Sequence, residues 1–169
     1  MIKKVSAEEN GQKGFDTVNR VLTSIGWSPQ ETEFEGVMRV DFGGDKIPIS
    51  EALADVRIEY ERFIYLLIFG ERAGSAHREE VAKFLTRANF GLVIGCFEFN
   101  LDNGEIRFRS SIDFTSSDLT ETLVRNSIRS SMDAVERYGD SIVKVLRGEL
   151  DAVRALKLAE GGNDSHGTT

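Results

Sequence analysis

An asparagine–glycine pair, Asn103–Gly104, constrains the fold of this chain more than any other short segment. This dipeptide is the preferred centre of the two-residue type I′ turn that closes a β-hairpin. Apolar side chains alternate with polar ones on both sides of it, which is the period-two pattern of half-buried strands. We therefore predict a hairpin with one apolar face, and with Cys96 and Glu98 on its other face. Its predicted pairs are Leu101–Ile106, Phe99–Phe108 and Phe97–Ser110.

Three more strands are predicted before this hairpin, over residues 34–42, 55–60 and 63–69. The last of them, Phe63–Phe69, is apolar or aromatic at every position. Such a run is typical of a strand that is buried on both faces. Two interpretations stay open: the strand is central and covered within one chain, or one of its faces is shared with a second copy or a partner. The candidate interface residues are Ile64, Leu66 and Ile68.

Helical periodicity accounts for the other segments with a clear pattern. Apolar stripes predict helices over residues 14–25, 75–89 and 118–147, with a short helical extension over 149–158. The resulting order is α-βββ-α-ββ-α, which predicts an α+β fold with an antiparallel five-stranded sheet packed by helices. We expect a single domain over residues 14–159, with flexible termini at 1–13 and 160–169.

The charge and the cysteine content exclude several classes of function. A net charge of −7 argues against nucleic-acid binding, because proteins of that class concentrate positive charge to displace counterions. Cys96 is the only cysteine, so no intrachain disulfide is expected. The chain starts with polar residues instead of an apolar signal core, and its longest apolar run is too short to span a bilayer. These features predict a cytoplasmic protein that does not bind membranes.

No combination of residues predicts an active site. Cys96 and His77 could form a nucleophile and base, but they fall on separate predicted elements, so an ordinary thiol is the better interpretation. One cysteine and two distant histidines, His77 and His166, give no zinc-binding pattern. The alternating Glu31, Glu33 and Glu35 are better explained as a solvated edge than as metal ligands. We therefore predict no catalytic, cofactor-binding or metal-binding residues and a protein that is not an enzyme.

From about residue 55 to residue 148 the sequence resembles the YbjN family of bacterial proteins. The residues that carry the resemblance are Asp55–Ile58, Tyr65–Leu67, Val81–Leu92 and Gly95–Arg109. The resemblance implies a fold similar to that of type III secretion chaperones. Those chaperones are acidic and in most cases homodimeric, and they bind extended segments of partner proteins on their sheets. The family is also described as a sensory-transduction regulator, and it provides no catalytic residue to transfer to this chain.

These observations favour a protein-binding, chaperone-like or regulatory module that is expected to form a homodimer and to hold a protein or peptide partner. The alternative is a regulatory domain that senses a small molecule. In that alternative the pocket would be lined by Phe97, Phe99, Phe108 and Phe114, although an apolar hairpin face is more often plain core.

Overall fold

The computed structural model describes residues 6–43 and 47–161. Within them the sheet has six strands in the spatial order β1-β2-β3-β4-β6-β5, and every neighbouring pair is antiparallel. Its strands are β1 (Gln30–Glu31), β2 (Val37–Asp41), β3 (Ile49–Arg57), β4 (Arg62–Phe69), β5 (Cys96–Phe99) and β6 (Ile106–Asp113). The predicted α+β class is confirmed. The predicted count of five strands is wrong by one, because the two-residue β1 adds an edge beside β2.

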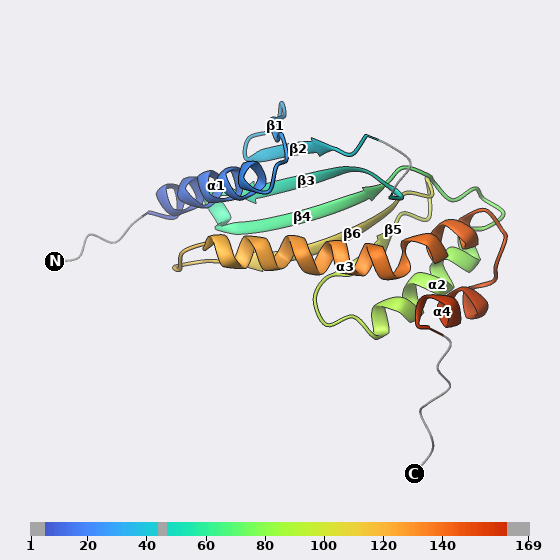
Figure 1. Ribbon diagram of the computed structural model, residues 1–169. Helices are drawn as coiled ribbons and strands as arrows, with labels where there is room; N and C mark the ends of the chain where they lie inside the picture. The colour runs from blue at the N-terminus through green and yellow to red at the C-terminus, as the bar shows by residue number, and fades with distance from the viewer. Residues whose placement is uncertain (1–5, 44–46, 162–169) are drawn as a thin grey trace, which may run out of the picture.

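The helices lie on one side of the sheet (Figure 1). They are α1 (Ala7–Ser24), α2 (Arg78–Phe90), α3 (Glu121–Leu146) and α4 (Ala152–Ala159). Between this layer and the sheet is a core of fully buried side chains. Its largest members include Phe63, Tyr65, Phe84, Phe108 and Tyr138. Aromatic rings meet edge to face within it, as between Phe97 and Phe108, whose centroids are 5.0 Å apart.

The starts of α1 and α3 differ from the predicted ones because a hydroxyl side chain caps each helix at another residue. Ser6 accepts a hydrogen bond from the Glu9 N–H, so α1 begins at Ala7 and residues 7–13 are helical. Thr120 caps α3 in the same way, so this helix begins at Glu121 instead of at the predicted residue 118. The domain limits at residues 14 and 159 stay a prediction. The outer parts of the two predicted flexible termini, residues 1–5 and 162–169, lie outside the described residues.

The turn between β3 and β4 also differs from the prediction of a strand over residues 55–60. β3 begins earlier, at Ile49, and residues 58–60 form a single 3-10 turn. Glu61 then adopts a left-handed conformation with φ of 52° and is buried. Its carboxylate accepts a hydrogen bond from the Asn10 side chain at 2.6 Å. This contact ties α1 to the start of β4.

The β5–β6 hairpin has a longer loop than the predicted two-residue turn. The Asn100 side chain accepts hydrogen bonds from the N–H groups of Asp102 and Asn103, which folds residues 100–105 into a wider loop. Gly104 has φ of 76° and lies against the Ala73 backbone, so only glycine suits this position. The observed pairs are Phe97–Phe108 and Phe99–Ile106. The predicted register was therefore wrong by two residues, but a shift of two leaves each side chain on its expected face.

The corrected register predicts unequal costs for two phenylalanine truncations. Phe108 is completely buried, whereas Phe99 is only partly buried. We expect Phe108→Ala to lower the free energy of unfolding by about 3–5 kcal/mol and Phe99→Ala to lower it clearly less. Urea unfolding of both variants measures the difference. Equal costs would contradict the observed register.

Candidate functional site

The sheet has an open face, the side away from the helices, and β4 shows the contrast between its two sides. Phe63, Tyr65, Leu67 and Phe69 point into the core, and all four are buried. The alternating residues Ile64, Leu66 and Ile68 point to the open face and are half-buried. The prediction that this strand is buried on both faces is therefore wrong for the chain alone. The role of these three residues as an interface stays a prediction.

Leu53 of β3 extends this apolar surface sideways. It lies opposite Leu66 in the register between β3 and β4 and is half-buried as well. The sequence interpretation missed Leu53 because it started the strand at Asp55. The alternation of Ala52 and Ala54 with Leu53 was the available signal, but alanine is too small to mark a buried face clearly. We call Leu53, Ile64, Leu66 and Ile68 the apolar stripe.

On the β6 side, two arginines and one glutamate border the apolar stripe. Glu98 accepts a hydrogen bond from the Nε of Arg107 at 2.6 Å and another from the Nε of Arg109 at 2.5 Å. Burial alone would raise the pKa of Glu98, but the hydrogen bonds and charges of Arg109 and Arg107 outweigh it, so the pKa is lowered. The carboxylate thus fixes both guanidinium groups in place. Two positive charges against one negative leave this border net positive.

On the β2 side, the border of the apolar stripe has the opposite net charge. The Nε of Arg39 lies 3.2 Å from Asp41 and 4.0 Å from Glu51. Two carboxylates against one guanidinium leave it net negative. The apolar stripe therefore separates a positive border from a negative one across the sheet.

At one end of the apolar stripe, the carboxylate of Asp55 is buried and only partly hydrogen-bonded. It lies opposite Ile64 and is 8% exposed. One carboxylate oxygen pairs with the Nε of Arg57 at 2.8 Å, and the other has no hydrogen-bond partner among the described residues. Burial raises the pKa of Asp55, and the adjacent Arg57 only partly offsets the rise. A buried carboxylate oxygen without a hydrogen bond raises the free energy of the folded chain. A partner that donated a hydrogen bond to Asp55 would remove part of that cost.

The residues considered for chemistry do not form a site within the described ranges. Cys96 lies on the open face opposite Arg109, whereas His77 precedes α2 and packs against Gly148 at the end of α3. His166 lies outside the described residues. In residues 6–43 and 47–161, no three or more His, Cys, Asp or Glu side chains gather as a metal site would require.

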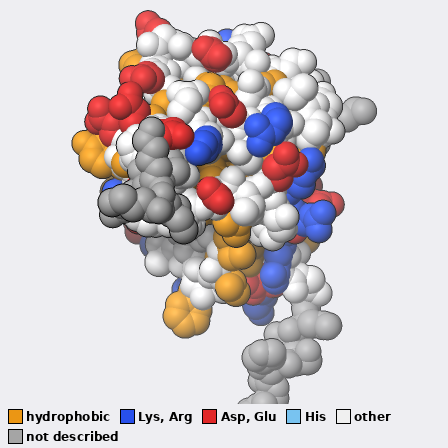
Figure 2. All heavy atoms as spheres, turned by 90° about the vertical axis from the view of Figure 1, so that its left-hand side faces the viewer, with side chains coloured by type: hydrophobic (Ala, Val, Ile, Leu, Met, Phe, Trp, Pro, Cys, Tyr) orange, Lys and Arg blue, Asp and Glu red, His pale blue; other side chains and the backbone are white. Residues whose placement is uncertain are grey.

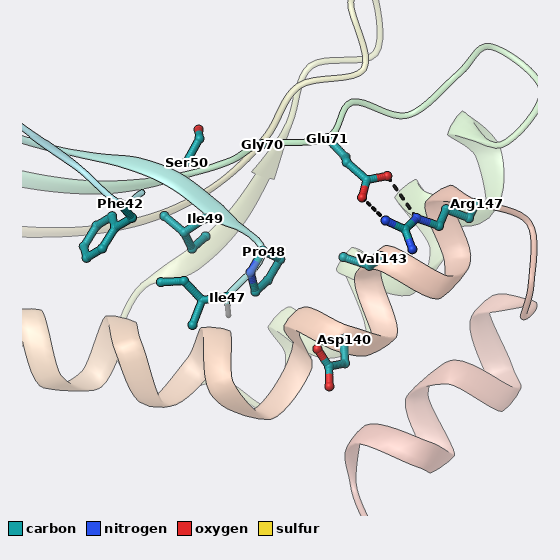
Figure 3. A pocket seen from close by; sticks show the side chains of 10 residues that line it. All are labelled: Phe42, Ile47, Pro48, Ile49, Ser50, Gly70, Glu71, Asp140, Val143 and Arg147. Carbon is teal, nitrogen blue, oxygen red and sulfur yellow. Dashed lines mark hydrogen bonds and ion pairs between the residues drawn. The ribbon is translucent and has the colours of Figure 1, made fainter. Parts of the chain in front are cut away.

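A cavity of about 580 Å³ lies where the β2–β3 end of the sheet meets α3 (Figure 3). Apolar side chains, among them Phe42, Pro48 and Val143, line one side of it. Glu71 and Arg147 form an ion pair across its other side. For the hairpin phenylalanines the structure favours plain core over the alternative of a ligand pocket. Phe97, Phe108 and Phe114 are buried in the core, and Phe99 packs against it.

The other surfaces show no comparable apolar stripe between charged borders among the described residues. Acidic and basic side chains are interspersed on the side of the molecule in Figure 2. Among the described helices, none combines the length and the apolar character that crossing a bilayer requires.

A family model named YbjN, described as "Putative bacterial sensory transduction regulator", matches residues 15–144. No curated protein matches the sequence.

Two solved structures share the fold. The first is YbjN from E. coli, described as "a putative transcription regulator", with a TM-score of 0.58 and 13% identity over 80% of this chain and 90% of that one. The second is the ExsC–ExsE complex, with a TM-score of 0.51 and 16% identity over 75% of this chain and 91% of the matched chain. They confirm the predicted type III secretion chaperone-like fold.

The ion pairs of Glu98 predict a pH-dependent share of the stability. The folded pKa of this carboxyl lies below its unfolded value, so its contribution is fully present above the unfolded value and is lost as the pH falls through the folded one. We expect Glu98→Gln to be less stable than the parent by about 1 kcal/mol at pH 7. The gap should close as the pH falls below about 4. Urea unfolding across this range measures it, and a gap that does not change with pH would contradict the ion-pair account.

Proposed function

This chain belongs to the YbjN family, and we propose that it is a non-enzymatic protein-binding module, chaperone-like or regulatory, that holds its partner on the open face of the sheet. The observation that carries this proposal is the apolar stripe. Leu53, Ile64, Leu66 and Ile68 form a continuous apolar surface in the centre of the sheet, on the side where Figure 1 shows no helix. Continuous apolar surface of this kind usually marks a site of association.

The solved relatives support a protein as the ligand. ExsC was crystallised with ExsE, so a chain of this fold can hold another protein. The charged borders support the same conclusion, because opposite charges on the two sides of an apolar surface fix the orientation of a partner.

A small-molecule sensor is the second candidate, and the cavity beside Pro48 and Arg147 favours it. Its volume lies within the range of ligand pockets. The polar groups at its wall already pair with each other, as Glu71 and Arg147 do. A ligand would have to compete with that ion pair, so the open face remains the stronger candidate.

The proposal predicts that one substitution on the open face abolishes capture of the partner. The tagged chain should enrich a specific protein from extract of its own cells, and Leu66→Asp should reduce that enrichment at least tenfold, about the effect of charging a binding hot spot. Leu158→Asp is the matched control, because Leu158 is an exposed apolar residue of α4 in the helix layer. Equal enrichment by both variants, each confirmed to be folded by thermal melting, would contradict the proposal.

We also propose that the chain is a homodimer whose contacts lie outside the open face. Phe90 and Val93, in and after the last turn of α2, are each 96% exposed, which is unusual for large apolar side chains. We expect the parent and Leu66→Asp to have the mass of two chains and Phe90→Asp to have the mass of one. Light scattering after gel filtration measures these masses. A monomeric parent, or a monomeric Leu66→Asp variant, would contradict this arrangement.

A further inference from the structure

Both edges of the sheet have features that oppose the addition of a partner strand, and this limits how a partner can bind. At the β5 edge, the Asn89 side chain takes the place of a neighbouring strand. Its Oδ1 accepts the Phe97 N–H at 2.8 Å, and its Nδ2 donates to the Phe97 carbonyl at 2.9 Å. At the other end of α2, Arg78 donates to the Leu101 carbonyl at 2.9 Å. Side chains from both ends of α2 thus bond to this edge and to the loop that follows it.

At the opposite edge, formed by β1, the residue types themselves disfavour the addition of a strand. β1 is only two residues long, and Pro29 precedes it, which has no N–H to offer a further strand. Glu31 lies in β1, and Glu33 and Glu35 follow it, so the edge is also strongly charged. Short, charged edges are a common protection against strand addition.

The open face therefore offers side chains and no backbone groups. Its central strands β3 and β4 pair with neighbours on both sides, so their N–H and carbonyl groups are already used within the sheet. An extended peptide laid on this face would lose water from its own backbone without gaining hydrogen bonds. A helix has already satisfied its backbone internally, and only its side chains need partners.

The dimensions and the charges of the face agree with a helix. From Ile64 to Ile68 the apolar stripe extends about 13 Å, at roughly 3.3 Å per strand residue. Apolar residues at positions i, i+4 and i+8 of a helix extend about 12 Å along one side. Arg107 and Arg109 border the stripe on one flank and are 41% and 38% exposed. Glu51 and Asp41 border the other flank.

From these features, and on the basis of the proposed function, we infer that the open face binds an amphipathic helix of the partner protein. Its apolar side lies on the apolar stripe, its acidic flank faces Arg107 and Arg109, and its basic flank faces Glu51 and Asp41. Because the two flanks differ in charge, such a helix is held in one direction along β4.

Designed peptides test this inference with the full chain. The probe is a fluorescent, alanine-based peptide of about 16 residues, long enough to hold a helix in water. It has leucine at i, i+4 and i+8, glutamate on one flank and lysine on the other. One control peptide has a central proline, which breaks the helix. The other alternates leucine with threonine, which favours an extended strand. Fluorescence anisotropy measures the three affinities.

We expect the helical probe to bind at least tenfold more tightly than either control. Leu66→Asp should weaken this binding at least about tenfold, whereas Asn89→Ala, which changes only the β5 edge, should leave it unchanged. A probe with lysine on both flanks should bind the parent more weakly, and the double variant Arg107→Glu/Arg109→Glu should reverse that preference. Thermal melting of each variant confirms that it is folded.

Two results would overturn the inference. One is tight binding of the alternating peptide, above all if it depends on Asn89, since the partner would then be an added strand. The other is failure of the helical probe to bind in an assay where the chain still captures its cellular partner through Leu66. In that second case the proposed function survives and the helical partner does not.

Discussion

The six-stranded sheet is covered by helices on one face only, and the arrangement of the candidate site depends on this constraint. β4, in the middle of the sheet, carries apolar side chains on both faces, but the helices bury only Phe63, Tyr65, Leu67 and Phe69. Its other face stays half-buried, although burying it would release more free energy. The protein therefore has an unused apolar surface on a rigid part of its fold. Rigid elements hold contact residues more accurately than loops do, which favours recognition by that surface.

The two faces also differ in the kind of apolar residue they carry. The helix-covered face holds the aromatic rings, and Phe97 of β5 meets both Phe108 of β6 and Tyr138 of α3 edge to face. The open face holds branched aliphatic residues next to fixed ion pairs such as those of Glu98. An apolar surface between fixed charges of opposite sign is the arrangement that the proposed partner site requires.

Much of the fold, but less of the site, could be predicted from sequence. Alternation over residues 97–112 gave the correct hairpin faces, yet the Asn100 side chain lengthened the loop by hydrogen bonds that no periodicity reveals. Ile64, Leu66 and Ile68 stood out as surplus apolar residues. Which side of β4 the helices would cover was not predictable, because both alternating sets are apolar. Leu53 was missed because its alanine neighbours mark a buried face only weakly, and the hydrogen bonds of Asn89 to β5 depend on a tertiary contact that no motif reveals.

The most direct test of this account is methyl nuclear magnetic resonance of the chain, labelled at isoleucine and leucine, free and in complex with its purified cellular partner. The account predicts that the signals of Leu53, Ile64, Leu66 and Ile68 shift on binding and lose their accessibility to a dissolved paramagnetic probe. Signals from Ile106 in the core and Leu158 in the helix layer should stay unchanged. Shifts confined to the helix layer, with the open-face methyl groups still accessible to the probe, would contradict it.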